Sequence, residues 1–132
     1  MKDLLTSIKA QTSNSFSRQF TVTEPKADKT GKLKLWDLLT EIEESTSEPT
    51  KQLCSVAPEY EKHRRNVNLD KFSDAHLGDE VEILARFYPS EKRTVKLRLF
   101  VRVLKGPKRT KKVARAEYTY EAVHEKQLSK AS

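Results

Sequence analysis

Three long runs of alternating apolar and polar residues in the C-terminal half constrain the fold of this chain most strongly. Every second residue is apolar or small in 81–87, 95–103 and 114–122. A period of two places successive side chains on opposite faces of a strand. Short turn-forming segments separate the runs, so they predict an antiparallel meander with one covered face and one wetter face.

A single segment of the chain has a strong helical period. Its apolar residues recur at i, i+3, i+4 and i+7 and share one helix face, which Trp36 widens; they are Leu35, Leu38, Leu39 and Ile42. We expect the helix to begin between Thr30 and Leu35. We expect it to end at 48–49, because a residue that precedes proline avoids the helical conformation. Residues 50–56 fit either a further helical turn or an irregular connection.

Two shorter segments, 16–23 and 64–72, also alternate as strands do. The order is therefore one strand, one helix and four strands. This order predicts an α+β fold, in which an antiparallel sheet of about five strands wraps around one long central helix.

The composition fits one small domain with a modest core. The chain has 132 residues, of which 36% are hydrophobic and 34% are charged. Such a polar chain concentrates its core in a few elements or completes it at an oligomer interface. We expect a single domain over 1–132, with a core of about 16–123 and flanking segments 1–15 and 124–132. No apolar run is long enough for a membrane helix, and the N-terminus does not read as a secretory signal.

Few residues are available for disulfides or metals. Cys54 is the single cysteine, which excludes an internal disulfide framework and a cysteine-based zinc site. The three histidines, His63, His76 and His124, are far apart in the sequence, which argues against a histidine-built metal site. We therefore expect no metal and a reducing, cytoplasmic location.

The net charge of +7 is unevenly distributed. Residues 51–132 hold 19 Lys and Arg against 11 Asp and Glu, so they carry the whole excess. Such a field favours an anionic partner, and nucleic acid, a phosphorylated cofactor or an acidic carrier protein would all fit. Nucleic acid is the least favoured, because no single basic strand interleaves a set of aromatic residues.

Three sequence motifs, taken together in their order along the chain, resemble the hotdog-fold thioesterase superfamily. This superfamily includes acyl-CoA, acyl-ACP and hydroxybenzoyl-CoA thioesterases. The motifs are DKTGKL at 28–33, LLTEIEES at 38–45 and LGDEVEI at 77–83. The segment 114–123 also resembles the closing strand of these proteins. The resemblance implies a sheet wrapped around a helix, assembly into dimers or tetramers, and a ligand cleft between subunits.

The resemblance also implies a mechanism. A carboxylate attacks the thioester carbonyl or activates water, and amides at the helix start bind the oxyanion. The implied acids are Asp28 and Glu43, with Ser47 one turn after Glu43 in a position to orient the acid or the water. The implied oxyanion donors are the backbone amides of Leu33, Lys34, Leu35 and Trp36. No cofactor is implied, since CoA or phosphopantetheine enters as part of the substrate.

Each candidate acid also has a structural interpretation. Asp28 lies in a polar turn, where Asp is common for local backbone reasons. Glu41 is expected on a solvated helix face. Glu43 shares the face of Leu35 and Leu39, so burial of that face would raise the pKa of its carboxyl group and suit it to general base catalysis.

Basic residues of the second half form a candidate site for the phosphates of CoA or for an acyl carrier protein. The alternative is an ordinary solvated, lysine-rich surface. The candidates are Arg64, Arg65, Lys96, Arg98, Lys108 and Arg109.

The sequence thus predicts a homo-oligomeric thioesterase that hydrolyses an acyl-CoA or acyl-ACP thioester. One alternative is a non-catalytic hotdog module that binds an acyl-thioester or a protein partner. A basic nucleic-acid-binding domain is the third hypothesis.

Overall fold

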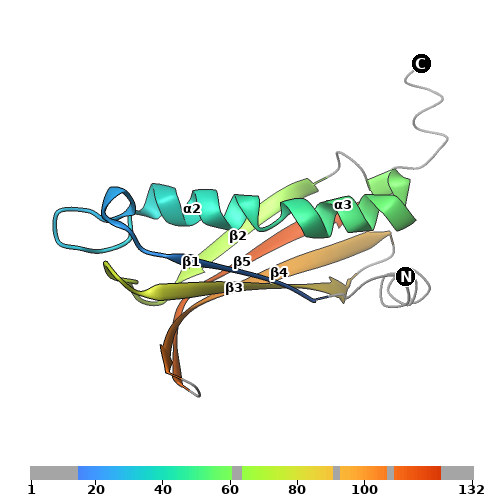
Figure 1. Ribbon diagram of the computed structural model, residues 1–132. Helices are drawn as coiled ribbons and strands as arrows, with labels where there is room; N and C mark the ends of the chain where they lie inside the picture. The colour runs from blue at the N-terminus through green and yellow to red at the C-terminus, as the bar shows by residue number, and fades with distance from the viewer. Residues whose placement is uncertain (1–14, 61–63, 91–92, 107–108, 123–132) are drawn as a thin grey trace.

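The computed structural model describes residues 15–60, 64–90, 93–106 and 109–122, without the side chains of 64–67. Five strands form one antiparallel sheet in the order β1-β3-β4-β5-β2 (Figure 1). The strands are β1 (Ser15–Thr21), β2 (Arg64–Lys71), β3 (Glu80–Pro89), β4 (Thr94–Gly106) and β5 (Arg109–Glu121). The helices are α2 (Leu35–Glu44) and α3 (Ser47–Val56), with 3-10 turns at η1 (Glu24–Lys26) and η2 (Pro58–Tyr60).

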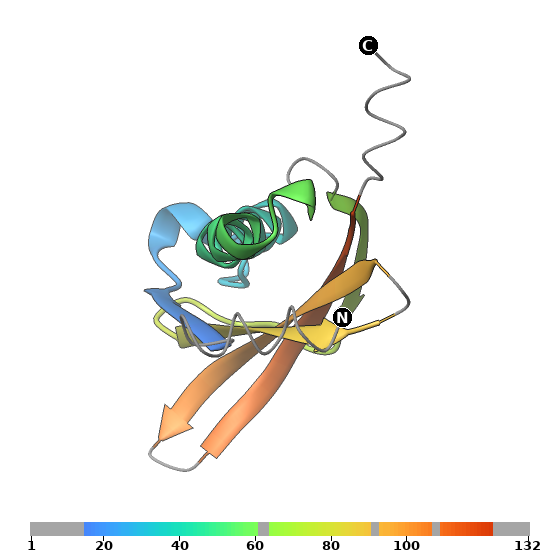
Figure 2. The ribbon, with the colours of Figure 1, turned by 90° about the vertical axis from the view of Figure 1, so that its right-hand side faces the viewer.

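The two helices lie end to end along one face of the sheet, and the sheet curves around them (Figure 2). This arrangement confirms the predicted fold class, an α+β fold with a sheet wrapped around a helical axis. The two edge strands of this sheet are β1 and β2.

The alternation predicted in the last three strands is confirmed. The residues that face the helices are buried, and their neighbours are half-buried or exposed. Val113 of β5 is the exception, because it is buried beside Ala114 where the register with β4 shifts. The buried residues of β4 are Val95, Leu97, Leu99, Val101 and Val103, each no more than 1% exposed. Continuous burial along one face of the sheet produces the core cluster of the described residues.

The β4–β5 hairpin is longer than the sequence predicted. The turn between the runs 95–103 and 114–122 is narrower than the gap between them, because β4 continues to Gly106 and β5 begins at Arg109. The hairpin projects past the rest of the sheet as a two-stranded arm (Figure 1).

The buried stripe of α2 is displaced by one turn from the predicted one. Leu38 and Ile42 are each 1% exposed, but Leu35 and Trp36 are 53% and 78% exposed. The observed stripe keeps the helical spacing and consists of Leu38, Glu41, Ile42 and Ser45. The prediction that Leu35 and Trp36 belong to the buried face is therefore wrong, and so is the prediction that Glu41 is solvated.

Glu41 is 3% exposed, and two cations compensate for its burial. Its carboxylate accepts a hydrogen bond from Arg18 of β1 at 2.8 Å and lies 3.3 Å from the Lys26 ammonium group. A buried carboxylate requires such partners. The three side chains connect α2 to the edge strand and to the turn that follows it.

The predicted helix end at 48–49 is wrong, because α3 runs on to Val56. Pro49 occupies the first turn of α3, where its missing N–H group is not needed. The first bond of α3 comes from the Thr50 amide to the Thr46 carbonyl at 2.9 Å. The interruption falls earlier, at Ser45 and Thr46, whose hydroxyl groups bond the carbonyls of Glu41 and Glu43.

Two motifs that are far apart in the sequence position the start of α2. The Leu33 amide donates to the Ala75 carbonyl at 2.8 Å, and the Leu77 amide donates to the Gly31 carbonyl at 2.7 Å. Gly31 adopts a φ of 83°, which other residues rarely adopt. The loop before the helix is thereby fixed against the turn that leads into β3.

Candidate active site on the helix face toward β5

A tyrosine of the sheet holds the carboxylate of Glu43. The Tyr118 hydroxyl group on β5 donates to Glu43 Oε2 at 2.6 Å. Tyr118 is 2% exposed, whereas Glu43 as a whole is exposed. The carboxylate therefore lies where the buried core meets the open side of the helix.

A second tyrosine makes a similar contact about two turns further along the helical axis. The hydroxyl groups of Tyr120 on β5 and Thr50 on α3 lie 2.5 Å apart. Tyr118 and Tyr120 share the covered face of β5 because they are two residues apart. Together the two contacts fix the helical axis on β5, with Glu43 turned toward that strand.

The start of α2 offers two of the four predicted oxyanion donors. The amides of Leu33 and Lys34 are already bonded to the carbonyls of Ala75 and Lys26, at 2.8 and 2.9 Å. The first bond within the helix comes from the Leu38 amide to the Lys34 carbonyl. The amides of Leu35 and Trp36 precede it, so they have no acceptor within the helix and lie at its positive end.

Glu43 and these amides are far apart within one chain. They are separated by eight residues of helix, which corresponds to about 12 Å along the axis. A thioester carbonyl that contacts one of them cannot contact the other within the same subunit.

The carboxylate of Asp28 stabilises the turn in which it lies. Its Oδ1 atom accepts from the Thr30 amide at 2.8 Å, the Thr30 hydroxyl group at 2.7 Å and the Lys32 amide at 3.0 Å. These bonds, first that of the Thr30 hydroxyl group and then that of the Lys32 amide, lower the pKa of the Asp28 carboxyl group. This is the geometry of a turn-stabilising aspartate, and a lowered pKa makes a weaker base.

Ser47 lies on the other side of the helical axis from the Tyr118 contact. It lines a depression of about 340 Å³ next to β1, with Phe16, Arg18 and Glu44. The interruption at Ser45 and Thr46 separates it from the turn that carries Glu43. The structure therefore does not bring Ser47 and Glu43 together as a continuous helix would have done.

The basic candidates are distributed over several places. Lys96 and Arg98 project from the face of β4 opposite the helices, where Glu117 lies 3.4 and 2.9 Å from them. Within one subunit they are thus across the sheet from Glu43. Arg109 is exposed at the start of β5. Lys108 and the side chains of Arg64 and Arg65 lie outside the described part of the chain.

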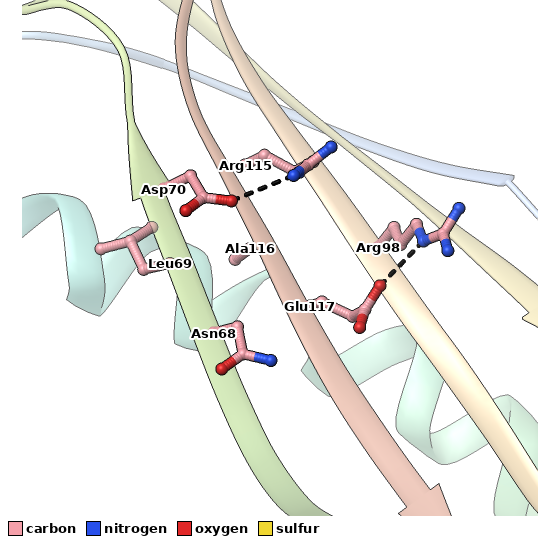
Figure 3. Close-up of a pocket in the computed structure, with 7 residues that line it drawn as sticks. All are labelled: Asn68, Leu69, Asp70, Arg98, Arg115, Ala116 and Glu117. Carbon is pink, nitrogen blue, oxygen red and sulfur yellow. Dashed lines mark hydrogen bonds and ion pairs between the residues drawn. The ribbon is translucent and has the colours of Figure 1, made fainter.

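The face of the sheet opposite the helices contains a second, charged depression (Figure 3). It measures about 460 Å³ and is lined by Asn68, Asp70, Arg98, Arg115 and Glu117, among others. The ion pairs Arg98–Glu117 and Arg115–Asp70 cross it at 2.9 and 3.0 Å. Arg98 lowers the pKa of the Glu117 carboxyl group, chiefly through this hydrogen bond. The depression is therefore internally neutralised.

The sequence did not identify Tyr118 as a site residue. One signal was available, because the alternation in 114–122 places Tyr118 on the covered face. A buried phenol normally finds a hydrogen-bond partner. Glu43 was one of the two acids that the resemblance implied, so it was a candidate for this partner.

The architecture is that of the hotdog fold, as the comparison with solved structures shows. No family model matches the sequence, and no curated protein sequence matches it significantly. Many solved structures match the fold, and those described next are thioesterases or a degradation protein of the same fold. The resemblance predicted from sequence is thus confirmed for the fold.

Three of these structures illustrate the similarity. The 4-hydroxybenzoyl CoA thioesterase of a Pseudomonas species superposes with a TM-score of 0.64 at 12% identity, over 83% of this chain and 84% of that one. A mutant of the phenylacetic acid degradation protein PaaI from Thermus thermophilus gives 0.65 at 18% identity, over 83% and 86%. A hexameric thioesterase from Yersinia pestis gives 0.61 at 16% identity, over 84% and 88%.

One further finding concerns the helices. In the part of the chain that the structure describes, no helix is both long enough and apolar enough to cross a membrane.

Proposed function

We propose that this protein is a thioester hydrolase that acts on an acyl group carried by CoA or by an acyl carrier protein. Glu43 acts as the general base or nucleophile, and the amides of Leu35 and Trp36 stabilise the oxyanion. The similarity to solved thioesterases supports the reaction class.

The contact between Tyr118 and Glu43 is the single observation that carries the assignment of Glu43. A base must be held in one orientation and still be reachable by water. Glu43 meets both conditions, because its carboxylate is bonded at 2.6 Å and its side chain is exposed. Asp28 is the weaker candidate, because three donors of its own turn occupy one of its carboxylate oxygens.

The separation of about 12 Å between Glu43 and the helix start requires two subunits. In a two-fold dimer, the helix start of one protomer can lie opposite Glu43 of its partner, and each dimer then has two equivalent sites. The exposed Leu35 and Trp36 support such an assembly, because large apolar side chains at 53% and 78% exposure mark an interaction surface. We therefore propose a homo-oligomer built from dimers.

The proposed reaction uses water and the chain's own residues. Acyl-CoA and acyl-ACP present the same phosphopantetheine thioester, so either carrier fits this chemistry. Cys54 is the single cysteine of the chain and cannot form an internal disulfide, which suits the cytoplasmic location that we propose.

The test is thiol release from a panel of acyl-CoA and acyl-ACP thioesters of different chain length and aromatic character. We expect turnover of at least one of them by the wild-type protein and a loss of about 100-fold or more in Glu43→Gln. Glu44→Gln is the matched control, because Glu44 is the neighbouring acid and contacts Arg18 instead. It should retain nearly full activity.

Two results would reject the proposal at different levels. An absence of thiol release from every thioester would remove the hydrolase and leave a binding module. Full activity of Glu43→Gln would retain the hydrolase and remove this carboxylate from its site.

A further inference from the structure

The face of the sheet opposite the helices carries a groove of aromatic rings and arginines, which we call the outer groove. Its volume is about 370 Å³. It is lined by residues of several strands and of the turn after β2, chiefly Phe72, Tyr88, Phe100, Arg86, Arg102 and Arg115. No single strand carries this set, because the residues are spread over three strands and a turn.

The lining of the outer groove is positively charged. Of the described residues that line it, four are Lys or Arg and none is acidic. Two acids next to the groove pair with its arginines. Glu82 accepts a hydrogen bond from Arg102 at 2.7 Å, and Asp70 accepts one from Arg115 at 3.0 Å. Each guanidinium group has five N–H donors, so one carboxylate leaves donors available for another anion.

Two arginines of this face lie directly opposite each other. Arg86 of β3 pairs in register with Arg98 of β4. Like charges at opposed positions destabilise a sheet. Glu117 offsets Arg98, whereas Arg86 donates to the neutral Ser15 hydroxyl group at 2.9 Å. The pairing therefore favours an anion that covers this face.

The rings are too far apart for one small ligand. Tyr88 lies four residues along β3 from Leu84, the register partner of Phe100, so the two rings are about 13 Å apart along the strands. Phe72 follows β2, two strands from β4, and thus lies about 10 Å to the side. A single base cannot contact all three rings, but successive bases of an extended strand can.

We propose that the outer groove binds single-stranded nucleic acid. Unpaired bases stack on Phe100, on the 56%-exposed Phe72 and on the ring face of Tyr88 that Arg98 leaves open, while Arg86, Arg102 and Arg115 bind phosphates. The Arg98 guanidinium group lies 4.6 Å from the centroid of the Tyr88 ring and covers its other face. Duplex bases are stacked on each other and offer no free face to the rings. An acidic protein would match the charge but would leave the rings without a stacking partner. This surface lies across the sheet from Glu43 and is independent of hydrolysis.

The test is fluorescence anisotropy of a labelled oligothymidylate of about 20 nucleotides, with the full chain at moderate salt. We expect saturable binding that weakens with added salt. Phe100→Leu removes a ring while it keeps an apolar side chain, and it should weaken binding about fivefold or more. Arg86→Gln should weaken binding and reduce the salt dependence, because it removes a phosphate contact.

Lys51→Gln is the matched control for net charge, since Lys51 is exposed on α3 on the helical side. It should bind within about twofold of wild type, and thermal melting should show all three variants folded. Four results would overturn the proposal: no saturable binding by wild type, equal loss in Lys51→Gln, equal competition by a duplex or by polyglutamate, or an effect of Phe100→Leu on oligomeric state alone.

Discussion

The Tyr118 hydroxyl group and the Glu43 carboxylate lie 2.6 Å apart and join the sheet to the helix at one polar contact. Tyr118→Phe removes the donor without removing the ring. We expect thiol release to fall about tenfold, equivalent to about 1.4 kcal/mol, because a hydrogen bond to a charged group is lost. The measurement is kcat and KM for the best thioester of the panel, together with a urea denaturation curve.

A purely structural role for Tyr118 predicts a different pattern. In that case Tyr118→Phe would lower stability but leave kcat and its pH profile unchanged. Tyr120→Phe is the control, because it removes the equivalent bond to Thr50, further along the helical axis.

Glu41 should be important for stability and unimportant for chemistry. Its carboxylate is buried between Arg18 and Lys26, which are themselves partly solvated. We expect Glu41→Gln to lower the free energy of unfolding by about 1–3 kcal/mol, since it leaves Lys26 without its anion and leaves Arg18 with Glu44 alone. Glu44→Gln, at an exposed position, should change it by less than about 0.5 kcal/mol. Urea denaturation of both variants measures this difference. Equal losses of stability in Glu41→Gln and Glu44→Gln would contradict a structural role for the buried carboxylate of Glu41.

Trp36 should report on assembly. It is the only tryptophan of the chain and is 78% exposed in the isolated subunit. If the helix start is an interface, its fluorescence emission should shift to the red on dilution, as subunits separate. Trp36→Lys should sediment as a smaller species than wild type, whereas Trp36→Phe should not. A wild-type protein that sediments as a monomer at all concentrations would contradict the proposed dimer.

Asp28 should contribute to stability in a pH-dependent manner. Its folded-state pKa is lowered from the ordinary value of 3.8, chiefly by the Thr30 hydroxyl group and the Lys32 amide. The stabilisation is therefore present above pH 3.8 and is lost as the pH falls through the lower, folded-state pKa. Asp28→Asn should melt below wild type at pH 7, and the difference should shrink as the pH falls below 3.8. Its thiol release should stay close to wild type.

Much of the fold could be read from the sequence, because the strands follow a strict period of two. The burial of Val81, Ile83, Ala85 and Phe87 matches the predicted alternation residue by residue. A period fixes which residues share a face but not which face meets the sheet. The spacing i, i+3, i+4, i+7 therefore predicted a buried stripe that begins at Leu35. The structure buries a stripe with the same spacing that begins at Leu38.

The site was less predictable, because it depends on contacts between distant segments. Glu41 is buried because Arg18 and Lys26 come to it from β1 and η1, and nothing in the local pattern shows this. Pro49 was predicted to end the helix, because proline disrupts a helix interior. The interruption at Ser45 and Thr46 places Pro49 instead in the first turn of a new helix, where proline is tolerated. The pairing of Tyr118 with Glu43 joins residues 75 positions apart.

In the proposed site, Glu43 and the helix-start amides act together across two subunits. Leu35→Pro removes one amide at a tolerated position, because Lys34 already has the extended conformation that precedes proline, with φ −66° and ψ 142°. Leu35→Ala is its control, since it removes most of the side chain and keeps the amide. Glu43→Gln removes the base. Each of the two damaged variants should be nearly inactive alone.

The decisive measurement is thiol release after the Leu35→Pro and Glu43→Gln subunits are unfolded together and refolded as a mixture. Random pairing makes half of the dimers mixed, and each mixed dimer has one intact site out of two, so we expect about a quarter of wild-type activity. A refolded mixture that is no more active than its two parents would contradict a site shared between subunits.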